Sequence, residues 1–212
     1  MTDFDGIARN VIDGKHLEVD RLVKEALAEG TEATTVLEKG LIAGMRVVGE
    51  RFARNEIFVP EVLVSARAMK AGLAHLEPIF SECGIEPVAR VVLGTVKGDI
   101  HDIGKNLVGM MLRGAGFEVI DLGVNTKLEA FLEAIHAHRP AIVGMSALLT
   151  TTMGQMKVNI DAFRAARLDV KVMVGGAPVS EEYARKIGAD GWGKNAPEAV
   201  ERALALVRER AG

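Results

Sequence analysis

Apolar residues in the first part of the chain recur every three or four positions, which is the spacing of an amphipathic helix. Residues 1 to about 86 show only this pattern, and they predict four helices. The first ends near Gly14 and the second stops at Gly30. The third is capped by Thr31, and the fourth carries Pro60 in its first turn. The third helix has the clearest stripe, formed by Leu37, Leu41, Met45, Val48 and Phe52. Short links between the helices predict an antiparallel four-helix bundle.

From residue 89 onward, short β-branched runs alternate with helical stretches, which is the pattern of an α/β domain. Strands are predicted at residues 89–94, 117–122, 141–146, 170–175 and 190–193. Helices are predicted at about 104–114, 127–138, 152–167, 180–187 and 197–210. These units predict a Rossmann-like (flavodoxin-like) domain, with a five-stranded parallel sheet in the order 2-1-3-4-5 and helices on both faces. The expected domains are residues 1–86 and 87–212, and the linker between them is expected from Pro78 to Pro87.

Composition and charge exclude several classes of function. A net charge of −3 and an aromatic content of 4% leave neither a basic surface nor stacking platforms for nucleic acid. Cys83 is the only cysteine, so neither an internal disulfide nor a zinc site built from cysteines can form. The N-terminus lacks the apolar core of a signal peptide, and no apolar stretch approaches the roughly 20 residues that span a bilayer. We therefore expect a cytoplasmic protein without nucleic-acid or membrane partners.

Three loops with polar residues or glycine each follow a predicted strand. The first lies in VVLGTVKGDIHDIGKN (91–106) and carries Asp99 and His101. The second is SALLTTTM, which begins at Ser146, and the third is Gly175-Gly176. In a parallel sheet these loops share the edge at the carboxyl ends of the strands, where such folds bind ligands. A single loop histidine is more often solvated or a helix cap, but three converging loops indicate a ligand site.

In chain order these residues form the pattern Asp99-x-His101-x-x-Gly104, then Ser146-x-Leu148, then Gly175-Gly176. The intervals between the motifs are 41 residues (105–145) and 26 residues (149–174). The pattern closely resembles the binding signature of cobalamin proteins that hold the cofactor with a histidine on cobalt. The resemblance implies a cobalamin cofactor, present as methylcobalamin or as a Co(I) corrinoid. It also implies that His101 replaces the benzimidazole tail as the cobalt ligand, and that the tail is buried between the first and third strands.

An imidazole is a good metal ligand when one nitrogen is free and a carboxylate holds the other N–H. Asp99, two residues before His101, is placed to hold that N–H. In cobalamin methyltransferases a serine extends this pair, and Thr152 occupies the corresponding position here. Thr152 is therefore expected to complete the catalytic set with Asp99 and His101, or else to cap the following helix. Asp102 is expected to cap the helix that begins near Gly104 and not to bind metal.

The remaining residues of the signature are expected to form the slot for the cofactor tail. Glycine leaves room for the tail at the first motif, hydroxyl and apolar side chains line the second, and two glycines let the backbone approach the nucleotide end. The residues implied by the resemblance are Gly104, Ser146, Leu148, Thr150, Gly175 and Gly176. The alternative for the Gly-Gly pair is an ordinary turn after a strand.

The segment RFARNEIFVPEVLVSARAMKAGL (51–73) resembles the helical cap of methionine synthase and of corrinoid proteins in one-carbon methyl transfer. The resemblance covers nearly the whole chain, although the first 30 residues match only in helical character. It implies that Phe52, Val59 and Val62 face the upper axial ligand of the cofactor, where an apolar lid limits side reactions of reduced cobalt. The alternative for all three side chains is the core of the bundle.

The resemblance implies a stand-alone corrinoid protein that carries a methyl group on cobalt between a substrate-specific methyltransferase and a second methyltransferase. Such a protein is a component of an enzyme system and is not catalytic by itself. The alternatives are a cobalamin-dependent sensor, the small subunit of an adenosylcobalamin mutase, and a doubly wound fold that binds no corrinoid. The methyl donor, the final acceptor and the oligomeric state stay open, since donor choice belongs to the partner enzyme.

Overall fold

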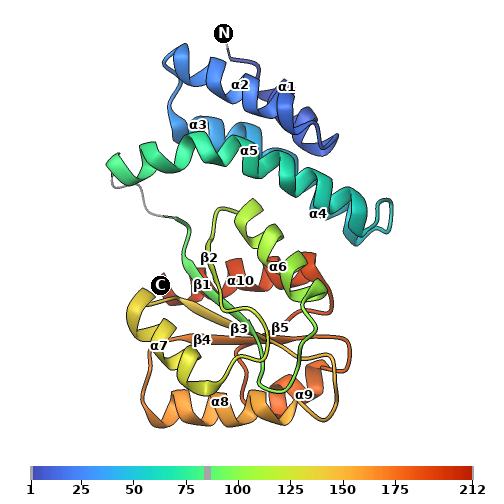
Figure 1. The fold of residues 1–212 in the computed structure, drawn as a ribbon, viewed down its shortest axis with the longest axis vertical. Coiled ribbons are helices and arrows are strands. Elements are labelled where there is room, and N and C mark those ends of the chain that lie inside the picture. The colour runs from blue at the N-terminus through green and yellow to red at the C-terminus, as the bar shows by residue number, and fades with distance from the viewer. Residues whose placement is uncertain (1, 84–86, 212) are drawn as a thin grey trace. The chain divides into compact units, whose positions relative to one another are not determined.

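The structure is a computed structural model that describes residues 2–83 and 87–211 (Figure 1). It divides into a helical unit that ends at Pro87 and a unit with a parallel sheet that begins at Val88. The helices of the first unit are α1 (Phe4–Ile12), α2 (His16–Ala28), α3 (Ala33–Val36), the π-helical turn η1 (Leu37–Ile42), α4 (Ala43–Ala53) and α5 (Val59–Cys83). Their positions confirm the prediction of a helical N-terminal domain.

The predicted third helix differs from the observed one in two respects. Its cap is not Thr31, since Glu32 precedes α3 without a side-chain cap bond and the Thr31 hydroxyl lies 2.5 Å from that of Thr2. The helix also contains η1, which a regular stripe of apolar positions does not reveal. A side chain at Gly40 of η1 would place its Cβ 2.8 Å from Ile7, so the π turn lies tightly against α1.

Helix α5 continues through Pro78 to Cys83, so the prediction that the linker begins at Pro78 is wrong. Proline inside a helix costs about 3 kcal/mol. Here buried Leu76 and the partly buried Ile79 and Phe80 lie on either side of Pro78 and favour continued helix. The later part of the predicted linker, residues 84–86, lies outside the described residues. Within the described ranges, neither α5 nor any other helix has the length and apolar character needed to cross a membrane.

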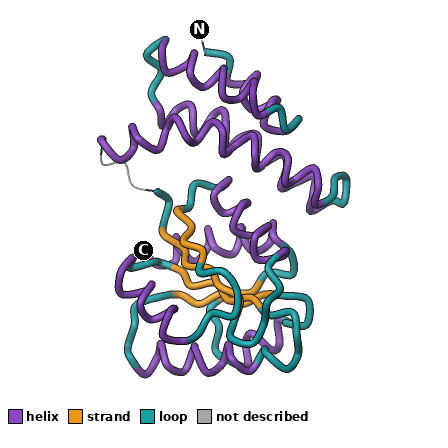
Figure 2. The backbone as a smooth tube through the Cα atoms, viewed as in Figure 1, coloured by secondary structure: helices purple, strands orange, loops and turns teal. Residues whose placement is uncertain are grey.

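The second unit alternates strands with helices, as predicted. The strands are β1 (Arg90–Thr95), β2 (Glu118–Asp121), β3 (Ile142–Ser146), β4 (Lys171–Gly175) and β5 (Gly191–Trp192). The helices are α6 (Ile103–Gly114), α7 (Leu128–His138), α8 (Gly154–Ala165), α9 (Glu181–Lys186) and α10 (Ala196–Ala211). The strands, orange in Figure 2, form one sheet. They are parallel and lie in the order β2-β1-β3-β4-β5, which confirms the predicted topology.

Alternate residues of the central strands face opposite sides of the sheet. On one face Val92, Val143 and Val172 join a core cluster with residues of α7, α8 and α9, including Phe131 and Phe163. The rings of these two phenylalanines meet edge to face, with their centroids 6.3 Å apart. In Figure 1, α6 and α10 lie on the other side of the sheet. With both faces covered, the ligand-accessible part of the sheet is the edge at the carboxyl ends of its strands.

Candidate functional site

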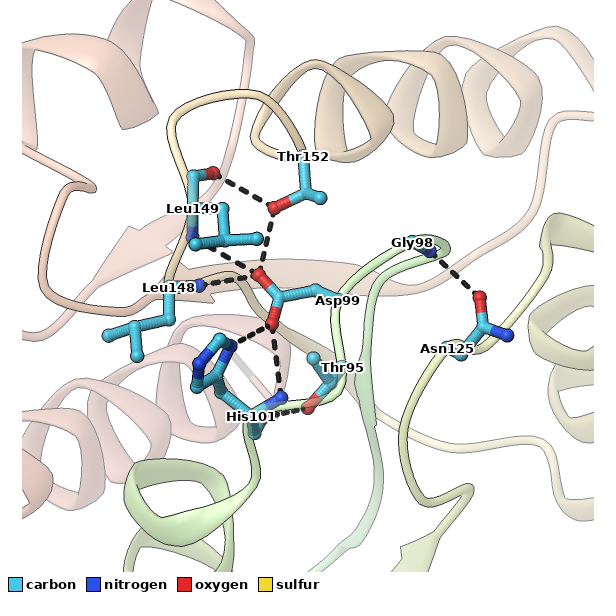
Figure 3. A network of polar contacts seen from close by, with 8 residues as sticks. All are labelled: Thr95, Gly98, Asp99, His101, Asn125, Leu148, Leu149 and Thr152. Carbon is cyan, nitrogen blue, oxygen red and sulfur yellow. Dashed lines mark hydrogen bonds and ion pairs between the residues drawn. The ribbon is translucent and has the colours of Figure 1, made fainter.

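The parallel register brings the three predicted loops to the same edge of the sheet. Thr95, the last residue of β1, pairs with Ser146, the last residue of β3. Ser146 in turn pairs with Gly175, the last residue of β4. The loops that begin after these residues therefore share one rim of the sheet, as the sequence predicts. This rim holds Asp99 and His101 from the first loop and Thr152 from the second (Figure 3).

Asp99 is the centre of the polar network at the rim (Figure 3). Its Oδ1 accepts hydrogen bonds from the backbone N of His101 at 3.1 Å and from the Nδ1 of His101 at 2.8 Å. Its Oδ2 accepts bonds from the backbone N of Leu148 at 2.8 Å, from that of Leu149 at 3.1 Å and from the Thr152 hydroxyl at 2.8 Å. The Asp99 side chain has no exposed surface, so these five donors replace water around it.

The network fixes the charge of Asp99 and the tautomer of His101. Burial by itself raises the pKa of the Asp99 carboxyl, but the hydrogen bonds from His101, Leu148 and Thr152 outweigh it and hold that pKa well below its ordinary value. An ionised carboxylate can only accept, so a neutral His101 donates from Nδ1 and keeps the lone pair on Nε2. The His101 side chain is 46% exposed. Nε2 can therefore reach a metal outside the protein surface.

Thr152 contacts Asp99 as the resemblance implies. Its hydroxyl lies 2.8 Å from Oδ2 of Asp99 and 2.8 Å from the carbonyl oxygen of Leu149, and its one proton is shared between these acceptors. The alternative role as a helix cap is not observed, because Met153 precedes α8 and no side-chain cap bond is formed there. Thr152 is thus positioned to orient the carboxylate of Asp99.

Sequence reasoning missed the backbone part of the network. The amides of Leu148 and Leu149 bind Asp99, whereas both side chains point outward and are about two-fifths exposed (43% and 42%). Ile100 and Ile103, on either side of His101, are also exposed, at 73% and 76%. The role of a backbone amide cannot be predicted from the type of residue that carries it. The two isoleucines in the polar loop around His101, by contrast, are visible in the sequence and could have indicated an apolar surface beside the candidate ligand. Together these side chains give the rim an apolar surface.

The predicted slot residues divide into open and closely packed positions. A Cβ at Gly104 would meet nothing within 4 Å, so this position faces free space. Gly176 has a φ of 126°, and its Cβ would lie within contact of the Ala147 carbonyl oxygen. Its own carbonyl accepts a bond from the N of Val179 at 2.9 Å, so it also begins a turn. Gly104 therefore leaves space at the rim, whereas Gly176 lets two backbone segments pack closely where a side chain would collide. Thr150 is exposed in the loop after β3.

Asp102 lies at the start of α6, where a cap was expected. Its Oδ2 accepts a hydrogen bond from the side-chain amide of Asn106 at 2.9 Å, and its carbonyl oxygen accepts one from the N of Asn106 at 2.7 Å. These contacts belong to the first turn of the helix. The backbone bond places Asp102 at the cap position of α6, and its carboxylate bonds to the Asn106 side chain; that it does not bind metal stays a prediction.

The three predicted cap residues lie in the helical unit. Phe52 is on α4 and Val59 begins α5, and both are partly exposed. Val62 is completely buried, which agrees with its alternative assignment to the core. Phe52 and Val59 have accessible surface with which to meet a cofactor. The assignment of all three to the upper side of a cofactor stays a prediction.

Comparison with known proteins identifies the family. Residues 89–201 match the family model of the B12 binding domain, and residues 4–77 match a second B12 binding domain model. The chain belongs to the B12-binding family. The predicted family is confirmed, and cobalamin is the cofactor that this membership implies.

Three proteins similar to this B12-binding chain show how far the likeness extends. A corrinoid protein of Desulfitobacterium hafniense is 43% identical over 208 residues, which cover 96% of each chain. The trimethylamine corrinoid protein of Methanosarcina barkeri is 42% identical over 192 residues, covering 89% of this chain and 88% of the relative. The crystal structure of the methanol:cobalamin methyltransferase complex MtaBC from Methanosarcina barkeri is 29% identical, with a TM-score of 0.85 over 96% of this chain and 78% of that chain. The similarity to these corrinoid proteins therefore extends over both the helical unit and the sheet unit.

Proposed function

We propose that this B12-binding protein carries a methyl group on the cobalt of cobalamin between two methyltransferases. One partner, specific for a methylated substrate, loads the group, and a second partner passes it onward. The observation that carries the proposal is the Asp99–His101 pair, which leaves Nε2 of His101 free at the rim of the sheet. The names of the relatives support the role, because they connect corrinoid proteins with trimethylamine and with a methanol:cobalamin methyltransferase.

The residues at the rim fit a cobalamin whose benzimidazole has left the cobalt. His101 offers one unprotonated ring nitrogen, and the exposed Ile100 and Ile103 offer apolar surface on either side of it. Gly104 faces open space, and Gly176, which is exposed, lets the backbone after β4 lie close to Ala147 in the loop after β3. A site of this kind, mostly apolar with a few placed polar groups, is typical for cofactors.

The chain's own residues bind, orient and shelter the cofactor. When bound, cobalamin supplies a cobalt atom that accepts a methyl group and gives it up again. Asp99 holds the Nδ1 proton of His101 and makes Nε2 a stronger donor to the metal. Thr152 fixes the orientation of Asp99 through its hydroxyl. We assign Phe52 and Val59 of the helical unit to the cover of the cofactor, where their apolar side chains would keep water away from it.

The ligation is tested by electron paramagnetic resonance of the Co(II) form. The protein is labelled with nitrogen-15 histidine and reconstituted with unlabelled cobalamin. Ligation by His101 predicts a doublet hyperfine splitting, because the nuclear spin of nitrogen-15 is one half. Retained benzimidazole, whose nitrogens are unlabelled, predicts a triplet. His101→Ala should lose the doublet, whereas His138→Ala, an exposed residue of α7, should keep it. A triplet in the parent protein would refute ligation by His101.

The carrier role is tested by following the methyl group itself. The reconstituted protein is reduced, treated with labelled methyl iodide, freed of excess reagent and mixed with a corrinoid-dependent thiol methyltransferase and its thiol. Label should move from the protein to the thiol. The His138→Ala protein should behave like the parent. If a folded, cobalamin-loaded protein fails to take up label or keeps it bound, a sensor or storage role replaces the carrier role.

A further inference from the structure

The loop that carries His101 is held by the connection between β2 and α7 (Figure 3). Asn125 in this connection contacts the loop at two points. Its side-chain Oδ1 accepts a hydrogen bond from the backbone N of Gly98 at 2.8 Å, and its backbone N donates to the carbonyl oxygen of Asp99 at 2.8 Å. Asn125 therefore fixes the backbone on both sides of the Gly98–Asp99 peptide, from the side opposite to Thr152.

The backbone conformations at this contact suit the residues that occupy it. Asn125 has a φ of 52° and Gly98 a φ of 84°, both in the left-handed region. Asparagine and glycine adopt this region more readily than other residues. Asparagine is also the residue that combines this tolerance with a neutral side-chain acceptor. Its identity at position 125 thus serves both contacts with the loop.

The far end of the same loop is held by the end of β2. Lys105, in the first turn of α6, donates from Nζ to both carboxylate oxygens of Asp121 at 2.6 Å and to Oδ1 of Asn106 at 2.7 Å. The Lys105 side chain is only 3% exposed, so Asp121 and Asn106 take the place of water around its ammonium group. Asp121 also accepts a bond from the N of Gly123 at 2.9 Å, which ties it to the connection that carries Asn125.

We propose that the segment Asp121–Asn125 positions His101 for cobalt. It holds the histidine loop at both ends, through Asn125 at Gly98–Asp99 and through Asp121 at Lys105. The inference rests on the proposed function, since it assigns positioning residues to the proposed ligand. Neither Asn125 nor Lys105 belongs to the motifs that carry the family resemblance.

Holding the histidine loop in place should favour binding of cobalt, because less conformational entropy is lost when the ligand binds. All of these bonds join protein atoms, so they can form before cobalamin arrives. A loop already held in its binding conformation loses less conformational freedom when cobalamin binds. Molecules whose loop is in another conformation do not bind, so the apparent affinity falls as their fraction rises. Asp99 alone cannot supply this restraint, because it moves with the loop that it belongs to. The segment after β2 is a separate element and provides a fixed reference.

Asn125→Gly tests the side-chain contact with little backbone strain, because glycine also adopts the left-handed conformation. The variant loses the acceptor for Gly98 and keeps the backbone bond to Asp99. We expect cobalamin to bind roughly three- to tenfold more weakly, which corresponds to one lost hydrogen bond. The share of the Co(II) form that shows the nitrogen-15 histidine doublet should fall as well.

Asn125→Asp provides the rescue, because aspartate keeps an acceptor and tolerates the same backbone conformation. Its affinity and its doublet should stay close to those of the parent. Arg167→Gly is the matched control, because Arg167 has the same φ of 52° in the turn after α8. It should leave both the affinity and the doublet unchanged.

Lys105→Met removes the second anchor and leaves Asp121 partly solvated, with 33% of its side chain exposed. It should act in the same direction as Asn125→Gly.

Amide hydrogen exchange in the cobalamin-free protein supplies a readout without the cofactor. In Asn125→Gly the amides from Gly98 to His101 should exchange faster, while those of β3 should keep the parent rates, because the core is untouched. Faster exchange in β3 as well would mean general destabilisation and would refute a local positioning role. If Asn125→Gly shows the parent's exchange rates in the loop, or the parent's doublet and affinity, the positioning inference is wrong. The proposed function still holds in that case, provided that the parent protein itself shows the doublet. A triplet in the parent would instead overturn the proposed ligation itself.

Discussion

At the scale of single residues, Asp99 connects the two loops that make the site. Its two oxygens accept bonds from His101 on one side and from Leu148, Leu149 and Thr152 on the other. The same bonds therefore orient the imidazole and hold the loop after β3. Because Asp99 is buried and ionised, one side chain has both a structural role and an electronic one.

This double role predicts the behaviour of Asp99→Asn. Asparagine offers one carbonyl oxygen in place of two carboxylate oxygens, and its NH₂ group faces existing donors. We expect the free energy of unfolding of the cobalamin-free protein to fall by about 3 kcal/mol at neutral pH, the scale of a lost bond to a charged group. Urea unfolding curves of parent and variant measure this difference.

The pH dependence follows from the lowered pKa of Asp99. Its unfolded pKa is about 3.9, and its folded pKa lies below that. The stabilisation is therefore fully present above about pH 4 and is lost as the pH falls toward the folded pKa. The parent should lose this part of its stability in acid, and Asp99→Asn should not. A gap between parent and variant that stays constant down to about pH 3 would contradict the assigned cause.

At the scale of elements, the site exists because β1, β3 and β4 end level with one another. The predicted strand and helix ranges of the sheet unit agree with the observed ones to within about two residues, because turn residues and β-branched runs mark their ends clearly. The π turn of η1 and the passage of α5 through Pro78 were not predictable in this way, since tertiary packing decides both. The contribution of the Leu148 and Leu149 amides was equally hidden, because every residue type except proline has a backbone N–H.

Gly176→Ala tests the close packing between the loop after β4, which contains Gly176, and the loop after β3, which contains Ala147. Its Cβ would collide with the carbonyl oxygen of Ala147, and its φ of 126° is unfavourable for alanine. We expect a loss of at least about 2 kcal/mol in the free energy of unfolding of the cobalamin-free protein. Gly104→Ala makes the same chemical change where a Cβ meets nothing within 4 Å. That control should keep or slightly raise stability, since it adds alanine to a helix, and should weaken cobalamin binding. Equal stability losses in both variants would refute the packing argument.

At the scale of the whole molecule, the chain combines two units of different architecture, and each matches a B12 binding domain model. The sheet unit carries His101, the proposed cobalt ligand, at its rim, and residues 89–201 match the B12 binding domain. The helical unit matches a second B12 binding domain over residues 4–77. The sequence predicted this division because the apolar spacing changes from helical to alternating strand and helix between the units. In the proposed role the methyl donor binds to the partner enzyme, so the partner and not this chain selects the methylated substrate.

The helical unit gives a prediction about the reduced cofactor. Phe52→Ala removes a large apolar side chain from the proposed cover while leaving His101 and its loop intact. Cobalamin affinity should stay close to that of the parent, whereas the reduced cobalt should be oxidised roughly three- to tenfold faster in air, because water and oxygen reach it more easily. The decay is followed by absorption spectroscopy after anaerobic reduction and exposure to a fixed oxygen concentration.

Phe4→Ala separates a cover from a general loosening of the bundle. Phe4 is a partly buried phenylalanine of α1 whose ring lies 5.9 Å from the Nζ of Lys39, and no motif places it near a cofactor. Its removal should loosen the helical unit by a similar amount without opening a path to cobalt. If both variants lose reduced cobalt at the same faster rate, bundle stability explains the effect and Phe52 has no special position. If neither differs from the parent, the assignment of Phe52 to the cover of the cofactor is wrong.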